Sequence, residues 1–384
     1  MADDRLDGAH PDGDGRRASA PPRAELADPA QPDWWIYRGT GRPLHDIDLH
    51  DLLPDPPRWR SFDGGPAQPM PGEDLAELDR RLGPVENAWL SRPDAREVEA
   101  VNAALYLRRP LMLTGNPGVG KSSLAYRISR ELRLGRVLRW PISSRSTLRS
   151  GLYEYDAIGR AQDSATRQAP RPPGGGRPGN PARSNAPAGS GPGEYIHLGA
   201  LGTALLPYEL PRVLLIDELD KSDIDLPNDL LDVFEEGQYT IPELVRVRAR
   251  EQEVIVHTAD PGGTAVIQDG QVRCRAFPMI VITSNGEREF PPAFLRRCIR
   301  LEMDDPDEER LASMVAAHFA DGADEHSAEL IRNFLEHRSV QGSLAADQLL
   351  NSVFLATSGC YTADESWDRL LDLIWQRLTM AGTQ

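Results

Sequence analysis

One stretch of this sequence has the residue types and the spacing that bind phosphate groups. Gly115 to Ser122 fits the pattern GxxxxGK[ST], in which a glycine-rich bend turns successive backbone N–H groups toward one anion. Lys121 would reach the β- and γ-phosphates of a nucleoside triphosphate, and the Ser122 hydroxyl would bind Mg²⁺. A glycine-rich turn without a nucleotide role is the alternative. The predicted binding residues are Gly115, Asn116, Pro117, Gly118, Val119, Gly120, Lys121, Ser122 and Ser123.

A pair of carboxylates supplies the second chemical feature. Asp217 and Glu218 end a run of four apolar residues that follows Arg212, as expected for a buried parallel strand whose carboxyl end faces a ligand. Asp217 is predicted to hold Mg²⁺ together with Ser122, and Glu218 to activate water as a general base. An acid pair that caps a helix end is the alternative interpretation.

Two further polar features follow the acid pair. Asn285 ends a third apolar run that begins at Pro278, and it is predicted to hold the attacking water; a strand cap is the alternative. Arg296 and Arg297 lie in a short segment expected to be helical. They either pair with local acids or reach the γ-phosphate of a neighbouring subunit, a role that contributes about 10³ to 10⁵ in rate.

The elements around these residues predict an α/β fold. Residues 110–114 form a strand-length apolar run before the phosphate loop, and Leu124, Ala125 and Ile128 recur at helical spacing after it. From about residue 304 the apolar residues follow helical periods. The sequence therefore predicts a P-loop NTPase αβα sandwich over 85–303 and a small all-helical lid domain over 304–384.

Two insertions interrupt the predicted sandwich. The stretch 160–193 is rich in Pro, Gly, Ser and Arg and is expected to be a flexible loop, either solvated or in contact with an acidic partner or nucleic acid. Short alternating strands are then predicted, with Asp269-Gly270 as a hairpin turn. Their arginines either face a substrate or pore, or keep strand edges soluble. The predicted strands are Leu244–Val247, Glu253–Thr258, Thr264–Gln268 and Gln271–Ala276.

The N-terminal region, 1–84, is predicted to be largely disordered. Residues 1–32 have almost no large apolar side chains with which to offset the entropy of ordering. An aromatic-rich segment, 33–62, follows them. It is either a docking segment for a partner or subunit, or an arm packed on its own domain.

Composition limits the functional classes. The net charge of −16 and the pI near 5.0 argue against nucleic acid as a general partner, and no apolar run approaches a membrane span. We therefore expect a cytoplasmic protein. Among 43 basic residues only Lys121 and Lys221 are lysines, which fits a compact ammonium retained in a phosphate loop.

The four motifs GNPGVGKS, LLIDELDKS, VITSN and PPAFLRRC occur in one order, and the sequence thereby resembles the AAA+ ATPases. It looks most like the MoxR branch, near the dynein-related, midasin-like subset. The resemblance implies ATP and Mg²⁺ as ligands and a ring, usually a hexamer. It also implies that Asn285 is sensor 1 and that Arg297, better than Arg296, matches the arginine finger. Ser339 to Ser343, with Arg338 nearby, replaces the usual sensor 2 arginine.

The resemblance implies ATP hydrolysis by a chaperone-like remodeller that acts with a von Willebrand factor A domain partner. A slow ATP-dependent assembly switch in a signalling or defence complex is the alternative. A nucleic-acid motor that uses the arginine-bearing strands is a third hypothesis. Steady turnover would indicate the remodeller, and retained nucleotide would indicate the switch.

Overall fold

The computed structural model describes residues 32–44, 48–87, 94–168, 191–319, 325–341, 344–358 and 365–375. The chain divides into two units, Met1–Trp35 and Ile36–Gln384, and the fold below is that of the second unit. Disorder is predicted for residues 1–32, of which 1–31 lie outside the described residues. Of the predicted flexible loop 160–193, residues 169–190 lie outside them. None of the described helices is long and apolar enough to cross a membrane.

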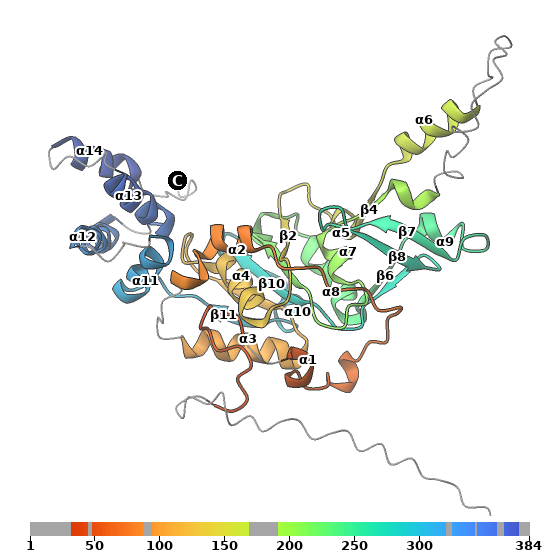
Figure 1. The fold of residues 1–384 in the computed structure, drawn as a ribbon, viewed down its shortest axis with the longest axis horizontal. Coiled ribbons are helices and arrows are strands. Elements are labelled where there is room, and N and C mark those ends of the chain that lie inside the picture. Colours follow the sequence, from red (N-terminus) through yellow and green to blue (C-terminus); the bar gives the residue numbers. More distant parts are fainter. Residues whose placement is uncertain are drawn as a thin grey trace, which may run out of the picture. The chain divides into compact units, whose positions relative to one another are not determined.

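The centre of the fold is a parallel sheet of five strands in the order β11-β1-β10-β5-β2 (Figure 1). Every residue of β5 and β10 is buried, so both faces of the sheet are covered, which explains the uninterrupted apolar runs in the sequence. The strands are β1 (Leu111–Thr114), β2 (Leu138–Pro141), β5 (Val213–Asp217), β10 (Met279–Ser284) and β11 (Ile299–Glu302). The predicted α/β P-loop fold is confirmed.

Helices cover this sheet and fix the ends of its strands. Helix α3 (Ala95–Leu107) packs on β1 and β11, and α4 (Lys121–Leu132) packs on β5 and β10. Leu124, Ala125 and Ile128 form the buried face of α4, as their spacing predicts. The remaining helices around the sheet are α5 (Leu148–Leu152), α7 (Ala200–Ala204), α8 (Leu226–Glu236) and α10 (Pro292–Leu295).

A second sheet has six strands in the order β3-β4-β7-β8-β9-β6. Its strands β7 and β8 alternate between buried and exposed residues, so one face packs on the core. Asp269 and Gly270 have φ values of 51° and 71°, as a two-residue hairpin turn of type I′ requires. The strands are β3 (Tyr153–Tyr155), β4 (Ile196–Leu198), β6 (Gln238–Thr240), β7 (Glu253–His257), β8 (Thr264–Gln268) and β9 (Gln271–Arg273).

Two predictions for these insertions are wrong. Leu244–Val247 is not a strand, because a short helix, α9 (Pro242–Val245), covers most of it. The fixed φ of Pro242 suits the first position of a helix. The predicted flexible loop begins instead as helix α6 (Ala157–Gln168). Asp156 accepts a hydrogen bond from the Gly159 N–H at its start, and alanines at every fourth position favour the helix.

The N-terminal part of the second unit packs on the helices that cover the parallel sheet. The arm, residues 36–44, lies on α3 and α4, where the buried amide of Asn102 bonds to the backbone of Ile36 and Tyr37. Helix α2 (Leu75–Leu82) packs on α4. A short helix, α1 (Leu49–Leu52), lies between the arm and α2 in the sequence. These contacts join residues that are far apart in the sequence, so the local hydrophobic periodicity does not predict them.

The C-terminal region is helical, as predicted. Leu311, Phe334, Leu349 and Trp375 are among the buried residues of its own hydrophobic core. Its helices are α11 (Glu308–His318), α12 (Glu325–Gln341), α13 (Ala346–Thr357) and α14 (Glu365–Ile374).

Candidate functional site

The phosphate-loop motif lies between β1 and α4. Gly118 has a φ of +80°, and a Cβ there would lie 2.3 Å from the Ala345 Cβ, so this position requires glycine. Helix α4 begins at Lys121 without a side-chain cap, which leaves the first N–H groups of the helix for an anion. The Lys121 Nζ donates to the carbonyls of Gly115 and Asn116 at 2.7 Å each. Burial lowers the pKa of Lys121, against the opposing effect of nearby carboxylates.

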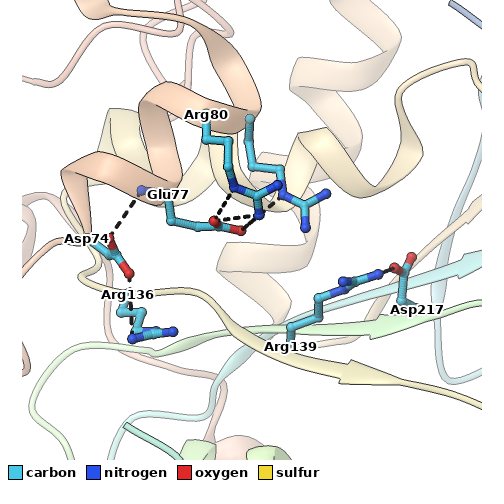
Figure 2. Close-up of polar contacts among 7 residues, drawn as sticks. Asp74, Glu77, Arg80, Arg136, Arg139 and Asp217 are labelled. Atoms are coloured by element: carbon cyan, nitrogen blue, oxygen red, sulfur yellow. Dashed lines mark hydrogen bonds and ion pairs between the residues drawn. The ribbon is translucent and has the colours of Figure 1, made fainter. Parts of the chain in front are cut away.

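The carboxylate of Asp217 accepts hydrogen bonds from three side chains. Its Oδ1 accepts from the Ser122 hydroxyl at 2.6 Å and from the Thr283 hydroxyl at 2.9 Å. Its Oδ2 accepts from the Arg139 Nη2 at 2.8 Å (Figure 2). Burial raises the pKa of Asp217, but the bonds from Ser122, Arg139 and Thr283 outweigh it, so the pKa lies below its ordinary value. Asp217 is therefore an anion at neutral pH.

Glu218 has a left-handed backbone conformation, with a φ of 62°. A non-glycine residue in this conformation costs about 1–3 kcal/mol, and such strain often marks functional positions. The Glu218 N–H donates to the Thr283 hydroxyl at 2.8 Å, which holds the bend. The side chain is partly exposed and accepts from the Lys221 Nζ at 2.8 Å.

Asn285 follows β10, the strand that pairs with β5, so it lies near the acid pair. The carboxylate of Asp220 accepts from the backbone N–H of Asn285 at 2.9 Å and of Glu287 at 3.2 Å. Asp220 is buried, and its Oδ1 has no hydrogen-bond partner among the described residues. The backbone at Asn285 is thus held by an acid that the sequence did not single out.

Arg296 and Arg297 lie away from the phosphate loop of their own chain. The Arg297 Nε donates to Glu235 of α8 at 2.5 Å, and its Nη1 donates to the Ala293 carbonyl at 3.0 Å. Arg296 is exposed, and its carbonyl accepts from Arg109. Neither arginine lines the pocket described next.

A pocket of about 450 Å³ adjoins the phosphate loop. The arm contributes Gly39, Thr40 and Gly41 to its wall, and α11 and α13 contribute residues of the helical region, such as Met314 and Leu350. Six predicted phosphate-loop residues line it, namely Pro117, Gly118, Gly120, Lys121, Ser122 and Ser123, whereas Gly115, Asn116 and Val119 do not. Glu218 and Asn285 line it as well, so the structure brings these two candidates to the same cavity.

The cations of the pocket differ in their partners. Among the residues that line it, Arg81, Arg127, Arg130 and Arg310 each form an ion pair with a carboxylate. Lys121 forms none with the described residues and bonds only to carbonyl oxygens. A bound anion would therefore find its least neutralised cation at Lys121.

One buried carboxylate, that of Glu97, joins three elements at the edge of the pocket. Arg127 of α4 donates to both of its oxygens, at 2.7 and 2.8 Å, and Arg310 of α11 donates at 3.3 Å. Tyr37 of the arm donates its hydroxyl at 3.4 Å. Burial raises the pKa of Glu97, but the two arginines outweigh it and hold the pKa below its ordinary value.

The helical region contributes a different arginine from the one near the expected sensor 2 position. Arg338 donates to the Pro306 carbonyl at 2.6 Å and does not line the pocket, whereas Arg310 does. The side chains of Gln341 and Ser343 lie outside the described residues.

The donor set fits Mg²⁺ bound to a triphosphate. The Ser122 hydroxyl and an ionised Asp217 carboxylate are hard oxygen ligands, and they already lie 2.6 Å apart beside the pocket. Sequence reasoning found both, but it missed Arg139, Thr283, Asp220 and Arg310, which bond to the predicted residues or line their pocket.

Comparison with known families agrees with this geometry. Residues 110–298 match the family described as "AAA domain (dynein-related subfamily)", and this match covers just under half of the chain. Over this segment the chain is therefore similar to AAA domains. The chain matches no curated protein.

Proposed function

We propose that this protein hydrolyses ATP with the help of Mg²⁺ bound at Ser122 and Asp217. The observation that carries the proposal is the 2.6 Å bond between these two side chains, beside a pocket in which Lys121 forms no ion pair with any residue that the structure describes. This arrangement puts a metal-binding pair and a cation that forms no ion pair with the described residues at one helix N-terminus.

Each predicted residue has a role in this proposal. Lys121 neutralises the β- and γ-phosphate oxygens, and Mg²⁺ when bound supplies further positive charge to them. Glu218 accepts the proton of the attacking water, and Asn285 orients that water. Thr283 supports both acids, because it donates to Asp217 and accepts from the Glu218 N–H.

We infer that Arg297, with Arg296 beside it, serves the site of a neighbouring subunit in a ring, for which a hexamer is the expected size. Its position supports this proposal, because neither arginine lines the pocket of its own chain. The partly exposed Arg297 is held by Glu235, so its fork is directed by an ion pair before any subunit contact forms.

The resemblance to the MoxR branch supports a finer proposal, that the ATPase is a chaperone-like remodeller with a von Willebrand factor A domain partner. We expect such a partner to bind best while ATP is held. Capture of proteins by the Glu218→Gln variant, with and without ATP, tests this: partners that bind equally in both conditions would argue against remodelling driven by ATP.

The test of the ATPase proposal is the Glu218→Gln substitution. The amide cannot accept the proton, so steady-state hydrolysis should fall by about 10² to 10⁴ while ATP remains bound. Glu236→Gln is the matched control, because Glu236 is an exposed acid of α8 outside the pocket. Hydrolysis by Glu218→Gln at the rate of the control would refute the assignment of the base.

The slow assembly switch is a second candidate, and one observation favours it. The Lys221 Nζ donates to a Glu218 carboxylate oxygen at 2.8 Å and thereby occupies an oxygen that would accept the proton of the attacking water, which suits slow turnover. Both side chains are partly exposed, so the pair is weak. Under this hypothesis Lys221→Ala should raise the single-turnover rate, and the wild-type protein should retain ATP over many minutes. Steady turnover with no gain in Lys221→Ala would favour the remodeller.

A further inference from the structure

Arg139 of β2 binds the carboxylate that the proposed Mg²⁺ site needs. Its Nη2 and Nε both donate to the Asp217 Oδ2, at 2.8 and 3.3 Å, and Figure 2 shows its side chain extending along the sheet toward Asp217. Leu138 and Trp140 on either side are buried, whereas Arg139 is on the exposed face of the strand. The guanidinium therefore approaches Asp217 from the solvated side.

The two oxygens of Asp217 have different partners. Oδ1 accepts from two hydroxyls, those of Ser122 and Thr283, and Oδ2 accepts from a full positive charge. A metal at Ser122 uses the same negative charge, directly or through a water. Two cations bound to one carboxylate repel each other. The Asp217 carboxylate therefore attracts the metal less strongly while Arg139 is bound to it.

Arg139 has no other carboxylate within ion-pair distance among the described residues, so Asp217 is its anchor. The negative charge of Glu77 on α2 also acts on Arg139, although Glu77 is bound by Arg80 and Arg81. The side chain of Arg139 is 44% exposed, so its guanidinium can turn toward water or toward Glu77 without disturbing the hydrophobic core. Departure from Asp217 is therefore a side-chain movement.

We propose that Arg139 competes with Mg²⁺ for Asp217, so that the metal binds only as the guanidinium leaves Oδ2. The inference rests on the proposed Mg²⁺–nucleotide site. The arginine lowers the metal affinity below that of the donor set alone. It also keeps Asp217 neutralised when the metal departs with product, which favours rebinding of an anionic nucleotide.

The experiment measures Mn²⁺ binding by electron paramagnetic resonance, in the presence of ADP, for wild type, Arg139→Gln and Arg136→Gln. Arg136 is the matched control, because it is an arginine of similar exposure near the start of β2 that pairs with Asp74 instead (Figure 2). We expect Arg139→Gln to bind Mn²⁺ about tenfold tighter, about 1.4 kcal/mol, and Arg136→Gln to match wild type. With EDTA present, a fluorescent ADP should bind Arg139→Gln more weakly than wild type. Neither an arginine nor a metal then neutralises the Asp217 carboxylate, and its negative charge repels the nucleotide.

The outcomes separate the inference from the function on which it rests. Equal Mn²⁺ affinity in wild type and Arg139→Gln, or weaker binding in the variant, would overturn the competition. No Mn²⁺ binding by wild type with ADP would overturn the proposed site and the inference with it. If Arg139→Gln does not fold, Arg139→Lys keeps the charge but loses the fork; an affinity between wild type and the tenfold gain supports the competition, and an affinity at or below wild type contradicts it.

Discussion

The start of the arm that lines the pocket is held by one buried amide, and removal of that amide gives a sharp prediction. Glu131 of α4 accepts further bonds from Arg38, Thr40 and Gly41 of the arm. Asn102 is fully buried, and its Oδ1 accepts from the N–H groups of Ile36 at 2.8 Å and Tyr37 at 3.0 Å. Its Nδ2 donates to the carbonyls of Tyr37 at 2.7 Å and Val98 at 2.8 Å. We expect Asn102→Ala to release the arm from α3.

The size of the effect follows from the groups left behind. Alanine would leave three buried backbone groups of the arm, on Ile36 and Tyr37, without their partner, at about 1–3 kcal/mol each if they stay buried. The arm can instead detach into water, which limits the total cost to about 2–4 kcal/mol. A local opening equilibrium that shifts by this amount exposes the arm about 30 to 1000 times more often.

Limited proteolysis measures that opening. Trypsin cleavage after Arg38, followed by mass spectrometry, should accelerate by about the same factor when reclosing is faster than cleavage. Asn228→Ala is the control, because Asn228 is exposed on α8. ATP should slow the cleavage in wild type, since Gly39 to Gly41 line the pocket. Equal cleavage after Arg38 in Asn102→Ala and the control would refute the anchoring role.

Three further predictions address the site. Asp220→Asn should lower kcat by about 10- to 100-fold while leaving KM for ATP nearly unchanged, because it loosens the backbone at Asn285; a purely structural role would lower only the unfolding temperature. Arg297→Ala mixed with Lys121→Ala protein should regain ATPase activity if the arginine acts across subunits, and inactive mixed assemblies would contradict this. Glu97 has a lowered pKa, so its contribution to stability is present above its ordinary value of 4.5 and is lost as the pH falls. The free energy of unfolding, measured in urea at about pH 7 and about pH 3.5, should therefore fall more between these pH values for wild type than for Glu97→Gln.

The sequence predicted the parts of the site that are local. The phosphate loop, Asp217 and Asn285 each end an apolar run, and the parallel pairing of β5 with β10 brings two of these ends together. A strand end followed by polar residues is recognisable because its cause is short-range. The family match over 110–298 agrees with the predicted α/β fold.

The rest depended on tertiary contacts. Arg139 is a plain exposed strand residue in sequence, and only the pairing of β2 with β5 places it at Asp217. Asn102 is an ordinary helix residue in the sequence, and only the contact with the arm in the folded chain gives it a role. The error at Leu244–Val247 has a different cause. Its short apolar pattern fits either a strand or a helix, and Pro242 at the first helical position favours the helix.

The scarcity of lysine gives the site an experimental handle. Apart from the amino terminus, the ε-amines of Lys121 and Lys221 are the only alkyl amines in the chain; one bonds to loop carbonyls and the other pairs with Glu218. Reductive methylation with ¹³C-formaldehyde would thus place isotope labels at these positions without mutagenesis. The resonance of Lys121 would report the binding of phosphate, and the resonance of Lys221 would report the breaking of its ion pair with Glu218. Both would be observed without a change of sequence.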